Sequence, residues 1–518
     1  MMQRTRRDFI RDVSAGVVAA SIGPSLAADL GFSTAFAAQG TDRLTFGALE
    51  PLVTMMQETA AAQLLPRVVE RMRNGTSLRD IVAATALANA RTFGGEDYVG
   101  FHTLMAIAPA FYMAGELPEE RRALPVLKVI FRNTSRIHES GGGPNREVLH
   151  PVQAPSLPPG TGPDALRQAV RRANVNEAEQ TFAGLVNGNA EAALNNVLHV
   201  VEDGAEVHRV VLPYRAWDLS GIIGRDHAYT LLRQSLRYCL NSERPQQLPY
   251  NSSIRNLIPR LLDSHQLMSR PVGNRAAEDR WVEELSETIF RGSPEQAADA
   301  AAAALAEGFD PAAVAEAVSL AVNQLVLRDN GRPQAEGPNK PAGSIHGDGI
   351  GVHACDSANA WRNLSRASNQ RNKVVCCIMG AWQAARDRAQ RGGSFLTWQP
   401  YPREDARELV RNVEVNRLLA ACEDAIRNRD QVRASATMHR YLAENQPVRP
   451  AWDLLLKYAI SEDGALHGEK FYRTSTEEYA ITRAAFRNRH LVALARVTAS
   501  AFGYAAPGYA DACNLLNA

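Results

Sequence analysis

The sequence predicts an all-α protein, built as a helical repeat bundle or toroid-like array of about four units. Apolar residues recur at steps of three and four over alanine-rich runs such as residues 294–307 and 311–328, which is the spacing of a helix with one buried face. Ser293 and Asp310, each followed by proline, are typical helix starts. Alternating patterns of β-branched residues are nearly absent, so strands are not expected.

A weak internal repeat indicates the four units. Four segments place an acidic or glycine-rich turn just before a histidine, after an apolar helix and ahead of an aromatic segment. The first three share the spacing Asp-x4-His, and the fourth is one residue shorter. The segments are residues 96–102, 202–208, 347–353 and 462–467. We expect one domain over residues 38–518, with repeat units at about residues 60–140, 165–242, 293–390 and 405–518.

Four stretches rich in proline, glycine and polar residues are expected to be loops. They are residues 141–163, 243–253, 329–344 and 390–404.

Each repeated turn is expected to close one helix and open the next, with glycine in the left-handed conformation and aspartate as the cap. The histidine then lies in the first turn of the second helix, where the helix N-terminus disfavours imidazolium. A neutral ring there can accept a proton or bind a metal. Four such helix starts around a pseudo-symmetric bundle would converge on one pocket, although a single histidine beside such a turn is more often structural. The repeated histidines are His102, His208, His353 and His467.

The preceding carboxylates, Asp97, Asp203, Asp348 and Asp463, are expected to orient these rings from behind. The histidines would act as general bases or as metal ligands. The candidate catalytic residues are therefore His102, His208, His353, His467, Asp348 and Asp203.

Two of the repeats gather a second histidine close to the carboxylate. Two imidazoles and one carboxylate suit non-haem iron, manganese or zinc. The spacing matches no established metal motif, and it indicates a polar cluster at the turn from His346 to His353 more strongly than a metal. The candidate ligands are His199, His208, His346 and His353, and the cofactor considered is a transition metal, iron, copper or manganese.

Arginines and aromatic residues follow the repeat histidines. The arginines are able to hold a carboxylate or a phosphate, but ion pairs with nearby acids such as Asp218 and Glu477 are the favoured interpretation. The candidate substrate-contacting residues are Arg215, Trp217, Trp361, Arg362, Tyr472 and Arg473.

Composition excludes several classes of protein. Lysine and arginine total 57 against 56 aspartate and glutamate, a net charge of +1, which argues against a nucleic-acid partner or a general affinity for anionic membranes. Six cysteines in 518 residues do not make a disulfide scaffold. A GxSxG nucleophile elbow, a P-loop and a GxGxxG turn are missing, which disfavours classical hydrolases, NTPases and Rossmann dehydrogenases.

The N-terminus resembles a twin-arginine export signal. The pair Arg6-Arg7 is followed by Phe9 and Ile10, then by a modestly apolar stretch too polar for a stable membrane span, and then by an A-x-A site at residues 35–37. The resemblance implies a signal peptide over residues 1–37, the twin-arginine (Tat) translocase as a partner during export, and a periplasmic or secreted location. Stable membrane insertion after cleavage is not expected.

The segment around the first repeat histidine also resembles a known family. Phe101-His102-x-Leu104, with the alanines that follow and Gly115-Glu116, is similar to the helical histidine repeats of questin-oxidase-like proteins, and so is the stretch from residue 346 to 362. That family includes cofactor-independent Baeyer–Villiger oxygenases. The resemblance implies an oxidoreductase.

The leading hypothesis is an exported helical enzyme with a central Asp/His pocket. It would be an oxidoreductase that acts on a small organic substrate, with iron, copper or manganese as the metal to be considered. A polymer-acting hydrolase or lyase of the cell envelope is the first alternative, and it requires a long open cleft lined by tryptophan and tyrosine. A non-catalytic helical scaffold or solute-binding protein is the second, and it requires the four histidines to be separate and individually hydrogen-bonded.

Overall fold

All regular structure in the described part of the chain is helical, which confirms the predicted all-α class. The computed structural model describes residues 43–139, 146–243, 248–390, 392 and 394–517. Within these residues the β-type pairing is limited to two isolated bridges, Arg275 with Phe309 and Glu462 with Ala505. The predicted signal peptide, residues 1–37, lies outside the described residues.

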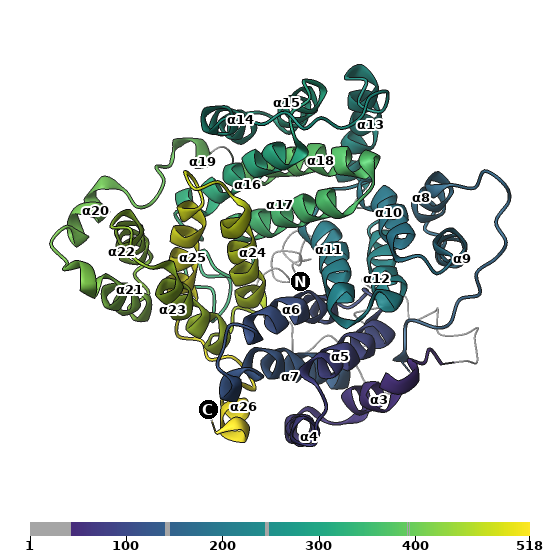
Figure 1. Cartoon of the computed structure of the whole chain (residues 1–518), viewed down its shortest axis with the longest axis horizontal. Helices are drawn as coiled ribbons and strands as arrows, with labels where there is room; N and C mark the ends of the chain where they lie inside the picture. Colours follow the sequence, from purple (N-terminus) through teal and green to yellow (C-terminus); the bar gives the residue numbers. More distant parts are fainter. Residues whose placement is uncertain (1–42, 140–145, 244–247, 391, 393, 518) are drawn as a thin grey trace, which may run out of the picture.

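Four helical hairpins form the middle of the molecule. Their second helices, α6, α11, α17 and α24, pack side by side in the closed order α6–α11–α17–α24–α6, and Figure 1 shows them around the centre. The first helices lie outside them. The hairpins are α5 (Leu78–Phe93) with α6 (Tyr98–Ala114), α10 (Ala190–Val201) with α11 (Val207–Ile223), α16 (Pro311–Arg328) with α17 (Ile350–Ala367), and α23 (Val448–Ser461) with α24 (His467–Ile481).

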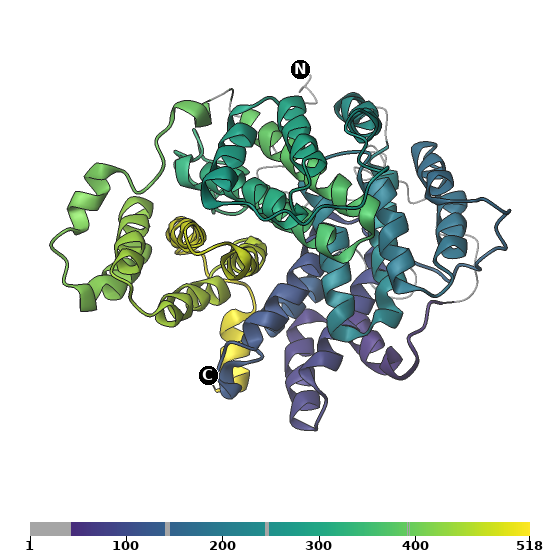
Figure 2. The ribbon, with the colours of Figure 1, turned by 45° about the horizontal axis from the view of Figure 1, so that its top comes forward.

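The remaining helices cover the hairpins from outside. Figure 2, a tilted view, shows the green helices α20 to α22 standing at one side of the molecule. None of the described helices is long and apolar enough to cross a membrane. The outer helices are α3 (Glu50–Glu58), α4 (Ala61–Arg73), α7 (Leu124–Glu139), α8 (Pro163–Arg171), α9 (Val175–Val186), α12 (Ala228–Asn241), α13 (Leu248–Ser264), α14 (Asp279–Arg291), α15 (Pro294–Ala306), α18 (Gln370–Ala389), α19 (Ser394–Thr397), α20 (Glu404–Val410), α21 (Leu418–Arg427), α22 (Gln431–Ala443), α25 (Asn488–Ala501) and α26 (Tyr509–Leu516).

The predicted helix starts at residues 294 and 311 are confirmed. The Ser293 hydroxyl accepts from the backbone N–H of Gln296 at 3.2 Å, and the Asp310 carboxylate accepts from that of Ala312 at 2.8 Å. Both side chains therefore satisfy donors that the first turn of a helix leaves open.

Two of the expected loops contain helix. Residues 243–253 were expected to be irregular, but α13 begins at Leu248, because a proline is tolerated in the first turn of a helix. The stretch 390–404 contains the single-turn helix α19.

A continuous apolar core runs through the four hairpins. The third hairpin is packed especially closely: a Cβ atom added at Gly351 would lie 2.7 Å from the backbone nitrogen of Val326. Only glycine therefore lets the start of α17 touch α16 at this point. This contact fixes the first turn of α17, two residues before His353.

Candidate functional site

The four repeat histidines meet at the centre of the closed ring of helices. His102 lies in α6, His208 in α11, His353 in α17 and His467 in α24, each within the first five residues of its helix, as the sequence predicts. We call these four side chains the four-histidine centre. Each ring neighbours the rings from the two adjacent helices, so residues up to 365 positions apart share one site.

The rings form two close pairs. Nε2 of His102 lies 3.1 Å from Nε2 of His208, and Nε2 of His353 lies 2.9 Å from Nε2 of His467. Between the pairs, the ring centroids of His102 and His467 are 5.3 Å apart and those of His208 and His353 are 5.8 Å apart. The four rings therefore form one continuous cluster.

The first pair is held from behind by strong hydrogen-bond acceptors. Nδ1 of His102 lies 2.7 Å from the carbonyl oxygen of Tyr98, one turn earlier in α6. Nδ1 of His208 lies 2.6 Å from Oε1 of Glu206. A carbonyl or a carboxylate oxygen can only accept, so Nδ1 carries the hydrogen in both rings. Their Nε2 atoms face one another.

The second pair is held differently. Nδ1 of His467 lies 3.2 Å from the carbonyl oxygen of Gly464 and 3.1 Å from that of Ala465, so it also carries a hydrogen. Nδ1 of His353 has no hydrogen-bond partner in the described part of the chain. His353 is therefore free to carry its hydrogen on Nε2 and to donate it to His467.

Burial keeps most of these rings neutral. It lowers the pKa of His102 and of His467 well below the usual 6.5, and the nearby charge of Lys470 lowers both pKa values further. Burial and the charge of His208 lower the pKa of His353 to about 3. Neutral imidazoles of this kind are competent bases or ligands.

Glu206 supplies the negative charge of the site. Its other oxygen accepts from the Tyr238 hydroxyl at 2.6 Å and from the backbone N–H of His208 at 3.0 Å. Burial alone raises the pKa of Glu206, but the charge and hydrogen bonds of His208 and Tyr238 together bring it far below its usual value. Glu206 is thus an ionised carboxylate that both caps α11 and orients the ring of His208.

Aromatic side chains wall the first pair. The ring of Phe101 stacks on His102 with centroids 5.0 Å apart and lies 5.1 Å from His208. Tyr98 lies 4.3 Å from the His102 ring, and 52 % of its surface is exposed. Tyr98 therefore separates the buried rings from solvent on that side.

A lysine that sequence reasoning missed lies beside the centre. Lys470 follows His467 by three residues in α24, a spacing that places both side chains on one helix face. It is buried, and its Nζ makes no hydrogen bond within the described residues. Burial lowers its pKa to about 8, although the charges of Asp356 and Glu469 oppose this. The signal for it was the rarity of lysine, five in the chain, combined with its register to His467.

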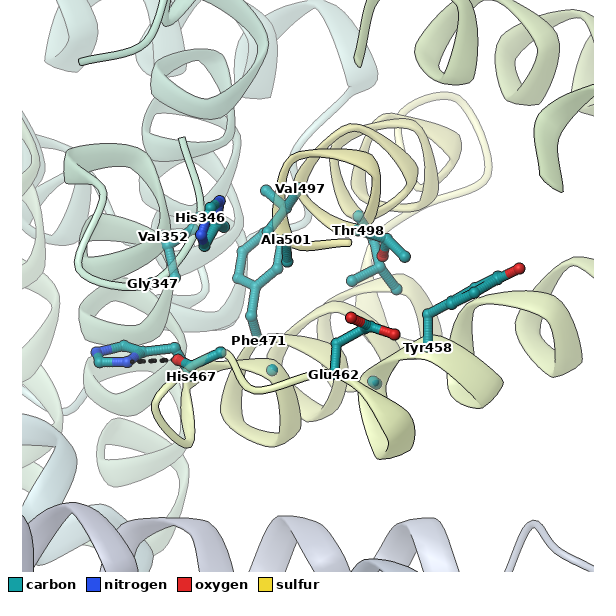
Figure 3. Close-up of a pocket in the computed structure, with 14 residues that line it drawn as sticks. His346, Gly347, Val352, Tyr458, Glu462, His467, Phe471, Val497, Thr498 and Ala501 are labelled. Carbon is teal, nitrogen blue, oxygen red and sulfur yellow. Dashed lines mark hydrogen bonds between the residues drawn. The ribbon is translucent and has the colours of Figure 1, made fainter. Parts of the chain in front are cut away.

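A small, largely apolar cavity adjoins the centre at His467. It leaves about 30 Å³ of free space, room for about two water-sized molecules. Figure 3 shows His467 and His346 on one side of this cavity and Phe471 and Val497 beside them.

The prediction that the four aspartates orient the histidine rings is wrong. Asp97 caps α6 through the backbone N–H of Gly100 at 2.7 Å and pairs with Arg136 at 2.6 Å. Asp463 accepts from the backbone N–H of Ala465 at 3.0 Å. Neither contacts a ring, because backbone carbonyls already occupy Nδ1 of His102 and of His467.

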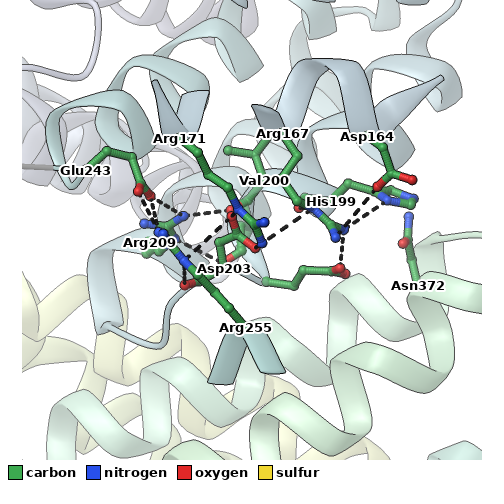
Figure 4. Close-up of polar contacts among 12 residues, drawn as sticks. Asp164, Arg167, Arg171, His199, Val200, Asp203, Arg209, Glu243, Arg255 and Asn372 are labelled. Atoms are coloured by element: carbon green, nitrogen blue, oxygen red, sulfur yellow. Dashed lines mark hydrogen bonds and ion pairs between the residues drawn. The ribbon is translucent and has the colours of Figure 1, made fainter. Parts of the chain in front are cut away.

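Asp203 and Asp348, the two predicted catalytic carboxylates, bind cations instead. Asp203 pairs with Arg171 at 2.6 Å on α8, in the buried network of Figure 4. Asp348 pairs with Arg332 at 2.5 Å and with Lys340 at 2.8 Å. Burial raises the pKa of Asp348, but the charge and hydrogen bond of Lys340 and the charge of Arg332 lower it overall.

The extra candidate ligands do not join the centre. Nδ1 of His199 lies 3.2 Å from a guanidinium nitrogen of Arg167, in the network of Figure 4. His346 is bonded at both nitrogens, to the Ser500 hydroxyl at 2.9 Å and to the Asn339 carbonyl at 2.7 Å. Among the described residues, no group of three or more His, Cys, Asp or Glu side chains is arranged so that it could hold a metal ion.

The predicted substrate arginines form ion pairs with acids of the chain, the interpretation favoured from the sequence. Arg362 lies 2.6 Å from Glu478. Arg473 lies 2.9 Å and Arg215 3.6 Å from Glu477, and Arg215 also lies 3.5 Å from Asp218.

The predicted substrate aromatics are also engaged. The Trp361 N–H donates to Gln383 at 2.8 Å, and the Tyr472 hydroxyl donates to Glu116 at 2.9 Å. Both are buried, while Trp217 is covered by the guanidinium of Arg225, 3.5 Å from its ring. None of the three lines the cavity beside His467.

Comparison with known proteins gives no relative from which a site can be transferred. No family model, no curated protein and no solved structure matches this chain. The function is therefore inferred from the four-histidine centre itself.

Proposed function

We propose that this chain is an exported oxidoreductase that acts on a small organic substrate at the four-histidine centre. The observation that carries the proposal is the convergence of His102, His208, His353 and His467 from four hairpins into one buried site. The N-terminal twin-arginine pattern supports export, and the resemblance of the first histidine repeat to questin-oxidase-like proteins supports the reaction class.

The chemistry that we propose is removal of two hydrogens from a substrate such as an alcohol or a quinol. Neutral rings in hydrogen-bonded pairs are suited to accept a proton and pass it on, as general bases do. The substrate gives up two electrons and two protons, and dioxygen takes up both to become hydrogen peroxide. The His353–His467 pair carries protons between the two and ends unchanged.

The size of the site supports this activity over polymer hydrolysis. The cavity beside His467 has room for about two water-sized molecules, which suits dioxygen and does not suit a polymer chain. Three residues are expected to line an open cleft. Trp361 and Tyr472 are buried and bonded to other side chains, and Trp217 is covered by Arg225.

A non-catalytic scaffold is also less well supported. In a scaffold each repeat histidine would be satisfied separately by its own hairpin. Here each ring uses Nε2 to contact a ring from another hairpin, and an ionised carboxylate and a buried amine lie next to them. Repeated packing alone does not call for this concentration of titratable groups, because burying each one costs free energy.

A transition metal is the redox group that we propose to test together with dioxygen. Imidazole suits copper and iron among such metals, and carboxylate or water ligands would complete the set for manganese. The rings approach one another in pairs, so a metal would have to draw the two pairs together.

The experiment measures oxygen uptake by the purified full chain. The protein is loaded in turn with copper, iron or manganese, or with no metal, and offered a panel of small alcohols, phenols and quinols. We expect substrate-dependent uptake that falls at least tenfold in His353→Ala and is unchanged in His265→Ala, which removes a histidine bonded to Asp299 at the surface. Absence of uptake in every metal form, or equal uptake in both variants, would overturn the proposal.

A further inference from the structure

If both rings of the His102–His208 pair are neutral, no hydrogen is left to lie between their Nε2 atoms. Nδ1 of His102 donates to the Tyr98 carbonyl, and Nδ1 of His208 donates to Glu206. A neutral imidazole has one N–H. If both rings were neutral, the bare Nε2 lone pairs would point at each other across 3.1 Å in a buried site.

Such an arrangement is unfavourable, because two acceptors at hydrogen-bond distance repel and neither is reached by solvent. The His353–His467 pair does not have this problem, since His353 is able to donate from Nε2. The difference between the two pairs lies in Nδ1: it has an acceptor in His102 and His208 and none in His353 among the described residues.

We propose that a single cation lies between Nε2 of His102 and Nε2 of His208. The inference goes beyond the proposed activity, because it follows from hydrogen bonding and holds whether or not the centre is catalytic. Two cations have the required chemistry. One is a proton, which makes the pair an imidazolium bonded to an imidazole, and the other is a transition metal ion with both Nε2 atoms as ligands.

The surroundings fit a cation. Glu206, ionised and bonded to His208, supplies the compensating charge at 2.6 Å. The faces of Phe101 and Tyr98 lie against the pair, and aromatic faces attract positive charge. Lys470 is a nearby opposing charge, but burial lowers its pKa to about 8, so it loses its proton more readily than an exposed lysine.

The spacing suits a shared proton directly, and it suits a metal ion after a small movement of the rings. A separation of 3.1 Å is within the range of an N–H···N hydrogen bond. Two imidazole nitrogens that bind one tetrahedral metal at about 2.0–2.1 Å lie about 3.3–3.4 Å apart, so a metal would require the two rings to separate slightly and turn.

The test uses the full chain labelled with ¹⁵N-histidine, because it needs no variant that must fold. Protein is purified with and without a strong chelator, and its metal content is measured by mass spectrometry. ¹⁵N–¹H correlation spectra then give the protonation of each ring near pH 7. We expect either about one transition metal ion per chain, or, in metal-free protein, one ring of the pair protonated at both nitrogens.

Variants assign the signal and distinguish the two sources. If the cation is a metal, we expect His102→Ala and Glu206→Gln to lower its retention at least tenfold, while His265→Ala and Asp299→Asn, which change the surface histidine–carboxylate pair, leave it unchanged. If the cation is a proton, the doubly protonated signal disappears in His102→Ala and Glu206→Gln and persists in the two surface variants. A metal-free chain in which both rings are neutral, one of them with its hydrogen on Nε2, overturns the inference. If the unchanged protein holds the cation but shows no oxygen uptake, the proposed activity is overturned and the cation inference stands.

Discussion

Nε2 of His353 and Nε2 of His467 lie 2.9 Å apart, although 114 residues separate them in the chain. His467 has its own hydrogen on Nδ1, so His353 must be the donor. The third and fourth hairpins are thus joined by a hydrogen bond with a defined direction.

Removing the donor should destabilise the fold. His353→Ala leaves Nε2 of His467 buried without a partner, which costs about 1–3 kcal/mol in the free energy of unfolding. Urea denaturation followed by circular dichroism measures this loss. The control is His265→Ala, expected within about 0.5 kcal/mol of the unchanged protein because the residue is at the surface. Equal effects of the two substitutions would contradict a stabilising hydrogen bond between His353 and His467.

Glu206→Gln should destabilise the second hairpin. The carboxylate caps α11 through the backbone N–H groups of His208 and Arg209, and an ionised cap also suits the positive end of the helix. We expect a loss of about 0.5–2 kcal/mol in the same measurement. Asp299→Asn removes a carboxylate from an exposed histidine pair and serves as the control. If Glu206→Gln and Asp299→Asn have the same urea midpoint of unfolding, the capping role of Glu206 is wrong.

Acid should weaken the protein before its carboxylates titrate. Burial lowers the pKa of His353 to about 3 and that of His346 to about 4, from 6.5 in the unfolded chain. Between pH 6.5 and 5 the unfolded chain therefore binds more protons than the folded one. The free energy of unfolding decreases as the pH is lowered, by up to about 1.4 kcal/mol per pH unit for each such histidine.

The urea midpoint between pH 6.5 and 5 checks this. His353→Gln, which cannot be protonated, should give a shallower decline than the unchanged protein. Parallel declines would show that His353 is protonated in the folded state.

The two buried lysines should respond in opposite ways to replacement by methionine. Lys128 is paired with Glu469 at 2.8 Å, so Lys128→Met leaves a buried carboxylate unpaired and costs about 3–5 kcal/mol. Lys470 has a lowered pKa, about 8, so keeping it charged at pH 7 already costs free energy. Lys470→Met should therefore leave the free energy of unfolding at pH 7 equal or higher.

Thermal and urea unfolding of the two variants at pH 7 measure the difference. For Lys470 the effect depends on pH: the cost of its charge is full below pH 8 and disappears as the unfolded lysine loses its proton near pH 10.5. A large loss of stability in Lys470→Met at pH 7 would contradict this account.

The helices and the meeting of the four repeat histidines were predictable because both are written in local patterns. Ser293 and Asp310 cap the helices that their position before proline predicts, and each repeat histidine begins the second helix of a hairpin. The closed packing of four such hairpins then brings the rings together without further information.

The partners of those rings were not predictable, because they depend on contacts between distant segments. Asp203 forms ion pairs with Arg171 and Arg255, which come from helices before and after it in the chain. His346 is taken by Ser500, 154 residues away. Glu206 lies two residues before His208 and directly before α11. This position was the sequence signal that Glu206, and not Asp203, bonds the ring of His208.

The closed order of the hairpins has a consequence for biosynthesis. The last ring, His467, comes from α24, which must pack against α6 from the beginning of the chain. A nascent chain therefore cannot complete the centre until the ribosome has released almost the whole polypeptide. Until that moment α6 has an unfilled flank, and contacts over such sequence separations form slowly. A truncation between residues 353 and 467 leaves three rings and an open seam.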